Sequence, residues 1–218
     1  MKTHHTVRTG LAAALTASVF GVVGAASAAD VTFDRLVKAD QEPQNWLTNH
    51  QNYSSHRHSG LTQINKQNVK DLKLAYAVQL KYNQGNAARP YGDNQATPLV
   101  EDGFMYTIDG WSRVSKIDVR SGRRGLIVWK YDPAVDKEFL TGGIRSRGLA
   151  LLGDQVYVLA RDGRVLSLKA ATGEPMWEEK LQHDITHYFT VAPLAVKDKI
   201  IYGAAGGETG GQIGRAHV

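Results

Sequence analysis

The sequence contains no cysteine and few prolines, and it has no long run of charges of one sign. Among its 218 residues, 6 are proline, 22 are glycine, 42% are hydrophobic and 22% are charged. The absence of cysteine excludes a disulfide framework, thiolate metal ligands, a cysteine nucleophile and a lipid-anchor cysteine. The composition is that of an ordinary globular protein, so it also excludes wholesale disorder and a collagen-like chain.

Positive charge is modest and scattered. The formal net charge is +5, and Lys2 and Arg8 at the N-terminus contribute part of it. The longest basic run is the pair Arg123-Arg124. Because nucleic-acid binding usually needs a basic patch or stripe, we expect no nucleic-acid partner.

The first 28 residues have the pattern of a secretory signal peptide. A basic start is followed by an apolar stretch over residues 11–23 and by the triplet Ala26-Ser27-Ala28, which fits a cleavage site. The alternative is an uncleaved membrane anchor, but the stretch is short, alanine-rich and without flanking stop-transfer charges. We therefore predict a cleaved signal peptide over 1–28, export to the bacterial periplasm and no stable membrane span.

The rest of the chain contains an internal repeat. Tyr106, Tyr157 and Tyr202 end similar apolar runs at intervals of about 50 residues, and a similar interval separates Trp129 from Trp177. Each full unit holds short runs of β-branched and aromatic residues separated by Asp-Gly and by Ser-Gly or Thr-Gly turns. Four short strands in a repeat of this length are typical of one blade of a β-propeller.

These repeats predict an all-β fold of the β-propeller class. We expect a leading segment over residues 29–94, followed by two blades and part of a third over residues 95–212. The tryptophan that ends each unit is expected to close over a turn of the next blade. Since a propeller closes with about four to eight blades, we expect the chain to be a fragment. Residues 213–218 abandon the repeat and can be encoded by a common sequencing-adapter sequence, so we expect them to be an artefact.

Three segments carry a resemblance to a known family. Residues 45–65 include Asn-Trp-Leu-Thr-Asn-His and Asn-Tyr-Ser-Ser-His-Arg, residues 169–177 include Thr-Gly-Glu-Pro-Met-Trp, and residues 192–208 end in Gly-Gly-Glu. In order and spacing they resemble the N-terminal segment, the tryptophan-docking motif and the third-blade cofactor segment of the pyrroloquinoline quinone (PQQ) dependent methanol and alcohol dehydrogenases. The resemblance extends from residue 30 to about residue 212.

The resemblance implies an eight-bladed propeller that holds PQQ and a Ca²⁺ or lanthanide ion on its axis. It also implies periplasmic oxidation of a small alcohol to an aldehyde, with electrons passed to a periplasmic cytochrome c, and it leaves a homodimer open. The family's catalytic aspartate is expected beyond Gln212, so no catalytic residue is assigned in this chain. For the same reason we expect the fragment to be inactive by itself.

Carried over residue by residue, the resemblance implies cofactor-binding residues and one metal ligand. The cofactor-binding residues are Gln95, Arg147, Thr190, Ala205, Gly206 and Gly207, and the metal ligand is Glu208. Arg147 matches an arginine that binds a PQQ carboxylate, and a guanidinium fork suits a carboxylate geometrically. Thr190 matches a threonine that faces the cofactor. The two glycines match small residues beneath the quinone, and a carboxylate such as Glu208 suits a hard cation.

The chain departs from the family pattern at three places. Gln95 stands where the family usually has a carboxylate, and Ala205 stands where it has a serine. Thr141-Gly142 stands where many members have a vicinal cysteine pair that stacks on PQQ. These differences indicate a divergent branch, in which any lid on that face of the cofactor is noncovalent.

Two other classes of protein share parts of this pattern. A non-enzymatic propeller scaffold, such as one that assists outer-membrane assembly, would share the tryptophan repeat but would not need Arg147, Thr190 and Glu208. A membrane-bound sugar dehydrogenase of the same superfamily would need several N-terminal hydrophobic spans, whereas this sequence has one short apolar segment. The sequence therefore favours the alcohol dehydrogenase.

Overall fold

The computed structural model describes residues 30–80, 93–140, 145–181, 187–205 and 216–217. The predicted signal peptide and the pair Thr141-Gly142 lie outside these residues. Helical structure in the described part is limited to α1 (Phe33–Val37) and three 3-10 turns, at Ala39–Gln41, Val69–Asp71 and Lys137–Leu140. The other regular elements are strands, as the predicted all-β class requires.

Most of the strands in the described residues form two four-stranded antiparallel sheets and a three-stranded one. The first sheet has the order β2 (Leu99–Glu101), β3 (Phe104–Ile108), β4 (Val114–Asp118) and β5 (Leu126–Tyr131). The second contains β7 (Ala150–Leu152), β8 (Gln155–Leu159), β9 (Arg164–Lys169) and β10 (Pro175–Lys180). The third contains β11 (Leu194–Val196), β12 (Lys199–Gly203) and β13 (Ala216–His217). Two blades and part of a third are therefore confirmed.

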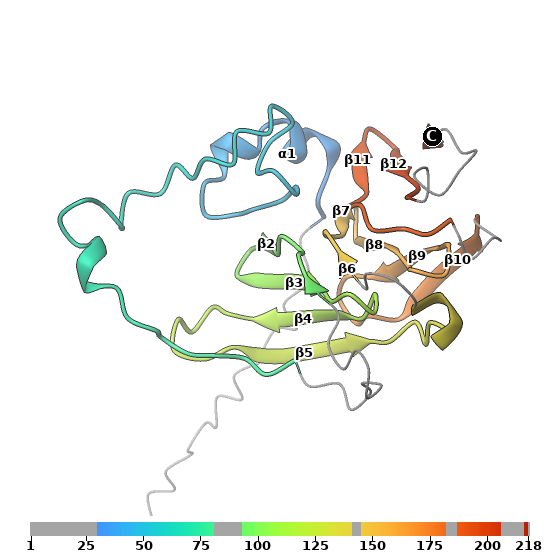
Figure 1. The fold of residues 1–218 in the computed structure, drawn as a ribbon. Helices are drawn as coiled ribbons and strands as arrows, with labels where there is room; N and C mark the ends of the chain where they lie inside the picture. The colour runs from blue at the N-terminus through green and yellow to red at the C-terminus, as the bar shows by residue number, and fades with distance from the viewer. Residues whose placement is uncertain (1–29, 81–92, 141–144, 182–186, 206–215, 218) are drawn as a thin grey trace, which may run out of the picture.

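Within each blade the chain runs from the centre of the molecule to its edge. Figure 1 shows the first two sheets next to each other, with β2 and β7 innermost and β5 and β10 at the periphery. The inner strands are mostly buried, whereas most of β5 and all of β10 are exposed or half-buried. The predicted hairpin turn between β2 and β3 is present, with Asp102 and Gly103 at φ +47° and +78°. Positive φ at such a turn matches the twist of the strands that it joins.

Trp129 joins the first blade to the second. Its indole Nε1 donates to the carbonyl oxygen of Ala170 at 3.1 Å, and Lys116 Nζ donates to the same oxygen at 2.9 Å. The indole ring covers Gly173, where a Cβ would lie 2.6 Å from ring atoms. The expected closure of a tryptophan over the next blade's turn is therefore present for Trp129. Trp177, at the equivalent position of the second blade, is 45% exposed.

The leading segment precedes the blades in the sequence. Its first part packs on the first two blades, and its later part loops away from them. Figure 1 shows residues 57–80 leaving the region of α1 in a wide arc and returning along β5. There Tyr76 and Val78 pack against Gly125, where a Cβ would lie 3.3 and 2.5 Å from them. Tyr76 thus lies on the first blade much as Trp129 lies on the second.

The first part of the leading segment is attached to both blades. Val31 forms an antiparallel bridge with Gly153, which follows β7, and Trp46 forms one with Val100 in β2. The side chains of Leu36 and Leu47 are buried in the main hydrophobic cluster, which includes residues of both blades. The leading segment therefore shares the core of the first two blades.

Candidate cofactor-binding site

The segments that lead into the three blades lie side by side. The short strand β1 (Asp93–Asn94) pairs in parallel with β6 (Arg145–Ser146). Just beyond this pair, Thr97 N donates to Arg147 O at 3.2 Å, and Arg147 N donates to Thr190 O at 3.0 Å. These bonds bring together three segments that are about 50 residues apart in the sequence. Arg147 and Thr190, predicted to share a site, are neighbours.

Arg147 is held by Thr190 and keeps part of its guanidinium available. Its Nη1 donates to Thr190 Oγ1 at 2.8 Å and to Thr190 O at 3.4 Å. Its side chain is otherwise exposed, and in the described part of the chain Nε and Nη2 have no hydrogen-bond partner. An arginine fixed on one side and open on the other can accept a planar anion such as a carboxylate.

Two further predicted residues flank this pair. Gln95 follows β1 and is exposed, and the β1–β6 register aligns the preceding residue, Asn94, with Ser146. Gln95 and Arg147, the next residues along the two segments, are therefore in register. Ala205 N donates to Tyr188 O at 2.9 Å, which ties Ala205 to the segment that carries Thr190. Gly206, Gly207 and Glu208 lie outside the described residues, so their assignments stay predictions.

Arg161 is a residue of this region that the sequence did not single out. Its side chain is almost fully buried, its guanidinium lies 3.8 Å from the centre of the Tyr188 ring, and its Nε donates to Phe139 O at 3.0 Å. Burial lowers the pKa of Arg161 below its usual range, and Arg145 acts in the same direction. In the sequence, Arg161 stands at an Asp-Gly turn, where an arginine is normally solvated. The contact with Tyr188 that distinguishes it is tertiary.

A cavity of about 270 Å³ opens next to Arg147. The leading segment contributes Thr48, Asn49, His50 and Tyr53, and the third blade's lead-in contributes residues 191–194. Among the described residues that line it there is no aspartate or glutamate. Asn49 Oδ1 is buried and has no hydrogen-bond partner in the described structure, which is uncommon for a buried polar atom. With no acid among its described neighbours in the cavity, Arg147 favours an anionic ligand. The buried, unpartnered Asn49 Oδ1 also indicates a ligand site.

Two kinds of feature are absent from the described residues. No group of three histidine, aspartate or glutamate side chains there is arranged to hold a metal ion. No helix in the same residues is long and apolar enough to cross a membrane.

The chain matches a family model and several known dehydrogenases. The β-propeller domain family of PQQ-dependent glucose, ethanol and alcohol dehydrogenases matches residues 46–209. A quinohemoprotein alcohol dehydrogenase, ADH-IIG, of Pseudomonas putida is 36% identical over 188 residues, which cover 84% of this chain and 24% of that protein. A lanthanide-dependent methanol dehydrogenase of Methylacidiphilum fumariolicum is 32% identical over 206 residues, which cover 90% of this chain and 32% of that protein.

A solved structure agrees with these matches. A europium-containing methanol dehydrogenase superposes with a TM-score of 0.71 at 30% identity, over 80% of this chain and 30% of that one. The fold and the sequence thus define a quinoprotein dehydrogenase propeller. This chain belongs to the PQQ-dependent dehydrogenase β-propeller family, as the resemblance predicted. It spans between about a quarter and a third of the length of the relatives described.

Proposed function

We propose that this protein is the N-terminal part of a periplasmic, PQQ- and metal-dependent alcohol dehydrogenase. The complete enzyme oxidises an alcohol to an aldehyde and passes the electrons to cytochrome c. Family membership supports PQQ chemistry on alcohols. The observation that carries the assignment to this chain is the Arg147–Thr190 pair, because it presents an open guanidinium beside a cavity whose described lining residues include no acid.

The residues at this site suit the acidic cofactor. PQQ carries three carboxylates, and Arg147 can form a charge-assisted pair with one of them while Thr190 fixes its orientation. Gln95 is neutral, so it adds no charge repulsion against a carboxylate and can donate from its amide. The backbone near Ala205 is tied to Tyr188, which places this small residue beside the Thr190 segment. The chain's contribution is thus to bind and orient the cofactor.

The proposed metal site rests on the chemistry of one residue, Glu208. Glu208 supplies a carboxylate of the kind that Ca²⁺ and lanthanide ions prefer. When bound, PQQ supplies the hydride-accepting quinone and the metal polarises its carbonyl as a Lewis acid. Two relatives are a lanthanide-dependent and a europium-containing methanol dehydrogenase, which supports a multivalent cation in this enzyme. The aspartate that takes the alcohol proton is expected beyond Gln212.

The proposal is tested by reconstituting two variants of the full-length apo-enzyme with PQQ and metal. We expect Glu208→Ala to lose metal binding and activity, because the remaining ligands cannot replace its charge. We expect Arg147→Ala to weaken PQQ binding about tenfold to a hundredfold, and excess PQQ should restore its activity. The readouts are titrations of PQQ and of metal, with a dye-linked alcohol assay. If neither substitution changes binding or activity, the site assignment is wrong and a non-enzymatic scaffold becomes the better description.

A further inference from the structure

We propose that the leading segment forms one wall of the cofactor site, and that His50 donates a second hydrogen bond to the carboxylate that Arg147 binds. This inference rests on the proposed function. His50 and Arg147 are 97 residues apart in the sequence, yet both line the cavity of about 270 Å³. That volume lies near the lower end of small-molecule sites, so it suits one acidic arm of a larger ligand.

Arg57 fixes the position of the His50 ring and selects its tautomer. Arg57 Nε donates to His50 Nδ1 at 2.8 Å, and Arg57 N donates to His50 O at 3.1 Å. An imidazole that accepts at Nδ1 carries its proton at Nε2 when it is neutral. In the described structure this Nε2–H has no partner, so it is a hydrogen-bond donor available on the cavity wall.

Asn49 brings the leading segment into contact with Gly148, the residue after Arg147. A Cβ on Gly148 would lie 3.1 Å from Asn49 Oδ1 and 3.0 Å from the Cβ of Ala192. Gly148 also has φ +154°, which L side chains rarely adopt. The absence of a side chain at Gly148 therefore lets the Asn49 amide pack directly beside Arg147.

The groups that meet at the cavity define the chemistry of its ligand. Arg147 supplies a cation and His50 supplies a hydrogen-bond donor, while the lining residues that the structure describes include no carboxylate that would repel an anion. Two donors from separate elements suit the two oxygens of a carboxylate. Such a group can come from PQQ or from a small free carboxylic acid, and the experiment distinguishes the two.

The test measures binding of PQQ to the full-length apo-protein by equilibrium dialysis and by quenching of tryptophan fluorescence, so that enzymatic activity is not the readout. We expect His50→Leu to weaken PQQ binding about tenfold. His50→Gln retains an N–H donor near the position of Nε2, and we expect its affinity to stay within about threefold of the wild type. His58→Leu is the matched control, because His58 is an exposed histidine of the same segment that does not line this cavity. Its affinity should not change.

The outcomes separate this inference from the proposed function. If Arg147→Ala weakens PQQ binding and His50→Leu does not, the leading segment has no part in the site, whereas the proposed function stands. If neither substitution affects PQQ binding, the proposed function fails as well. A loss in His50→Gln equal to that in His50→Leu, with unchanged thermal melting of both variants, would also overturn the donor role.

Acetate is the second probe: if His50 affects acetate binding but not PQQ binding, the cavity takes a free acid and the inference is wrong.

Discussion

Charged side chains in this protein are stabilised by specific neighbours rather than by solvent alone. Lys116 is 1% exposed, and burial lowers its pKa. Its ammonium group lies 4.4 Å from the centre of the Phe104 ring and donates to Ala170 O. At the end of the same strand, Asp118 accepts hydrogen bonds from the backbone and the guanidinium of Arg120. Each of these charges therefore has an identifiable effect on stability.

The Asp118–Arg120 pair predicts a pH-dependent contribution to stability. The hydrogen bonds from Arg120 lower the pKa of Asp118 from its ordinary 3.8 to about 2. Because the folded-state pKa is depressed, the stabilisation is present above about pH 4 and is lost as the pH falls toward 2. We expect Asp118→Asn to lower the free energy of unfolding by up to about 1 kcal/mol at pH 6, since the pair is partly exposed. Urea denaturation at pH 6 and near pH 2 checks this, and a difference that does not shrink at the lower pH would contradict it.

Packing between neighbouring blades depends on the close approach of Trp129 to the turn that joins β9 to β10. Gly173 is required there for two reasons, its φ of +78° and the indole ring that covers it. The equivalent turn of the first blade contains Gly122, which has φ +63° and open space around it. Substitution of the two glycines therefore distinguishes the cost of backbone strain, which both positions share, from the cost of lost packing, which arises at Gly173 only.

We expect Gly173→Ala to destabilise the protein more than Gly122→Ala. Both substitutions place a side chain at positive φ, at a cost of about 1–2 kcal/mol. Only the first forces Trp129 out of place, which should add about 1–3 kcal/mol. Chemical denaturation, followed by tryptophan fluorescence, measures both variants. Equal losses would show that the Trp129 contact contributes little to the blade interface.

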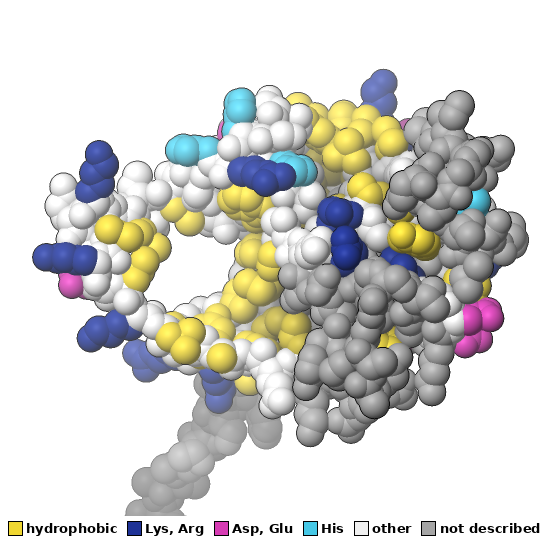
Figure 2. Space-filling model, viewed as in Figure 1, with side chains coloured by type: hydrophobic (Ala, Val, Ile, Leu, Met, Phe, Trp, Pro, Cys, Tyr) yellow, Lys and Arg dark blue, Asp and Glu magenta, His cyan; other side chains and the backbone are white. Residues whose placement is uncertain are grey.

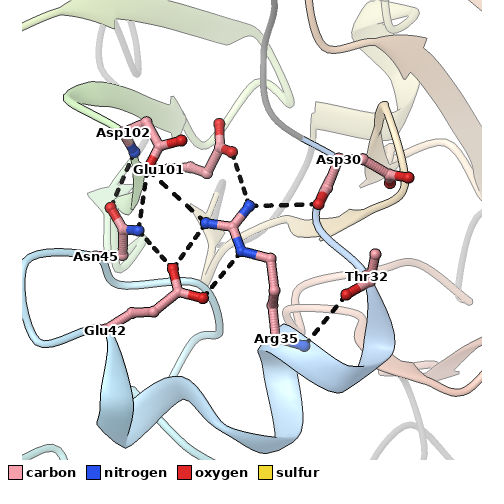
Figure 3. Close-up of polar contacts among 7 residues, drawn as sticks. All are labelled: Asp30, Thr32, Arg35, Glu42, Asn45, Glu101 and Asp102. Atoms are coloured by element: carbon pink, nitrogen blue, oxygen red, sulfur yellow. Dashed lines mark hydrogen bonds and ion pairs between the residues drawn. The ribbon is translucent and has the colours of Figure 1, made fainter.

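The leading segment is joined to the first blade by a cluster of charges around Arg35. Figure 3 shows the Arg35 guanidinium between Glu42 and the turn that carries Glu101 and Asp102. Arg35 donates to Glu42 at 2.7 and 3.0 Å and to Glu101 at 3.1 Å. Asn45 completes the cluster by accepting from Asp102 N at 2.9 Å. Glu101 is 1% exposed; burial raises its pKa, while Arg35 lowers it.

Removal of Arg35 should therefore detach the leading segment. We expect Arg35→Met to lower the free energy of unfolding by about 3 kcal/mol, because it leaves the buried Glu101 without its hydrogen-bonded ion-pair partner. Lys38→Met is the matched control, since Lys38 pairs with Asp34 on the surface and its loss should cost less than about 0.5 kcal/mol. Urea denaturation gives the two values. Proteolysis of residues 30–60 should be faster in Arg35→Met only, and equal rates would contradict the role of the cluster.

At the scale of the whole molecule, the outer strands expose much apolar surface. Figure 2 shows apolar side chains along the edge formed by β5 and the returning part of the leading segment. Leu74 is 84% exposed, and Leu72, Leu126 and Val128 are each about half exposed. On β10, Met176 and Trp177 are 53% and 45% exposed. Apolar patches of this kind are typical of surfaces that another part of a protein covers.

We predict that the 218-residue chain by itself is inactive and prone to aggregation. The exposed outer strands offer apolar side chains, and within the described residues β5 and β10 each pair with one strand and so leave an edge for association. Size-exclusion chromatography of the purified chain checks the prediction, with a dye-linked alcohol assay on each fraction. A compact monomer that melts cooperatively would show that two blades and part of a third are sufficient for a stable fold.

The sequence by itself determined the β-strand hairpins, the repeat and the propeller class. These depend on local chemistry, because Asp-Gly and Thr-Gly turns and β-branched runs specify strands over a few residues, and the interval between Trp129 and Trp177 repeats them. The resemblance further gave Arg147 and Thr190 as residues of one site, and the structure places them in contact.

Only the tertiary structure decided which distant side chains meet. The burial of Arg161 against Tyr188, the charge cluster around Arg35 and the cavity that both His50 and Arg147 line all depend on the meeting of separate elements. In sequence, each of these residues has the local surroundings of an ordinary solvated side chain. Tyr188 lies 27 residues from Arg161, and Glu101 lies 66 residues from Arg35. No local pattern encodes which blade edge or loop will approach such residues. The contacts arise because adjacent blades and the leading segment share one core.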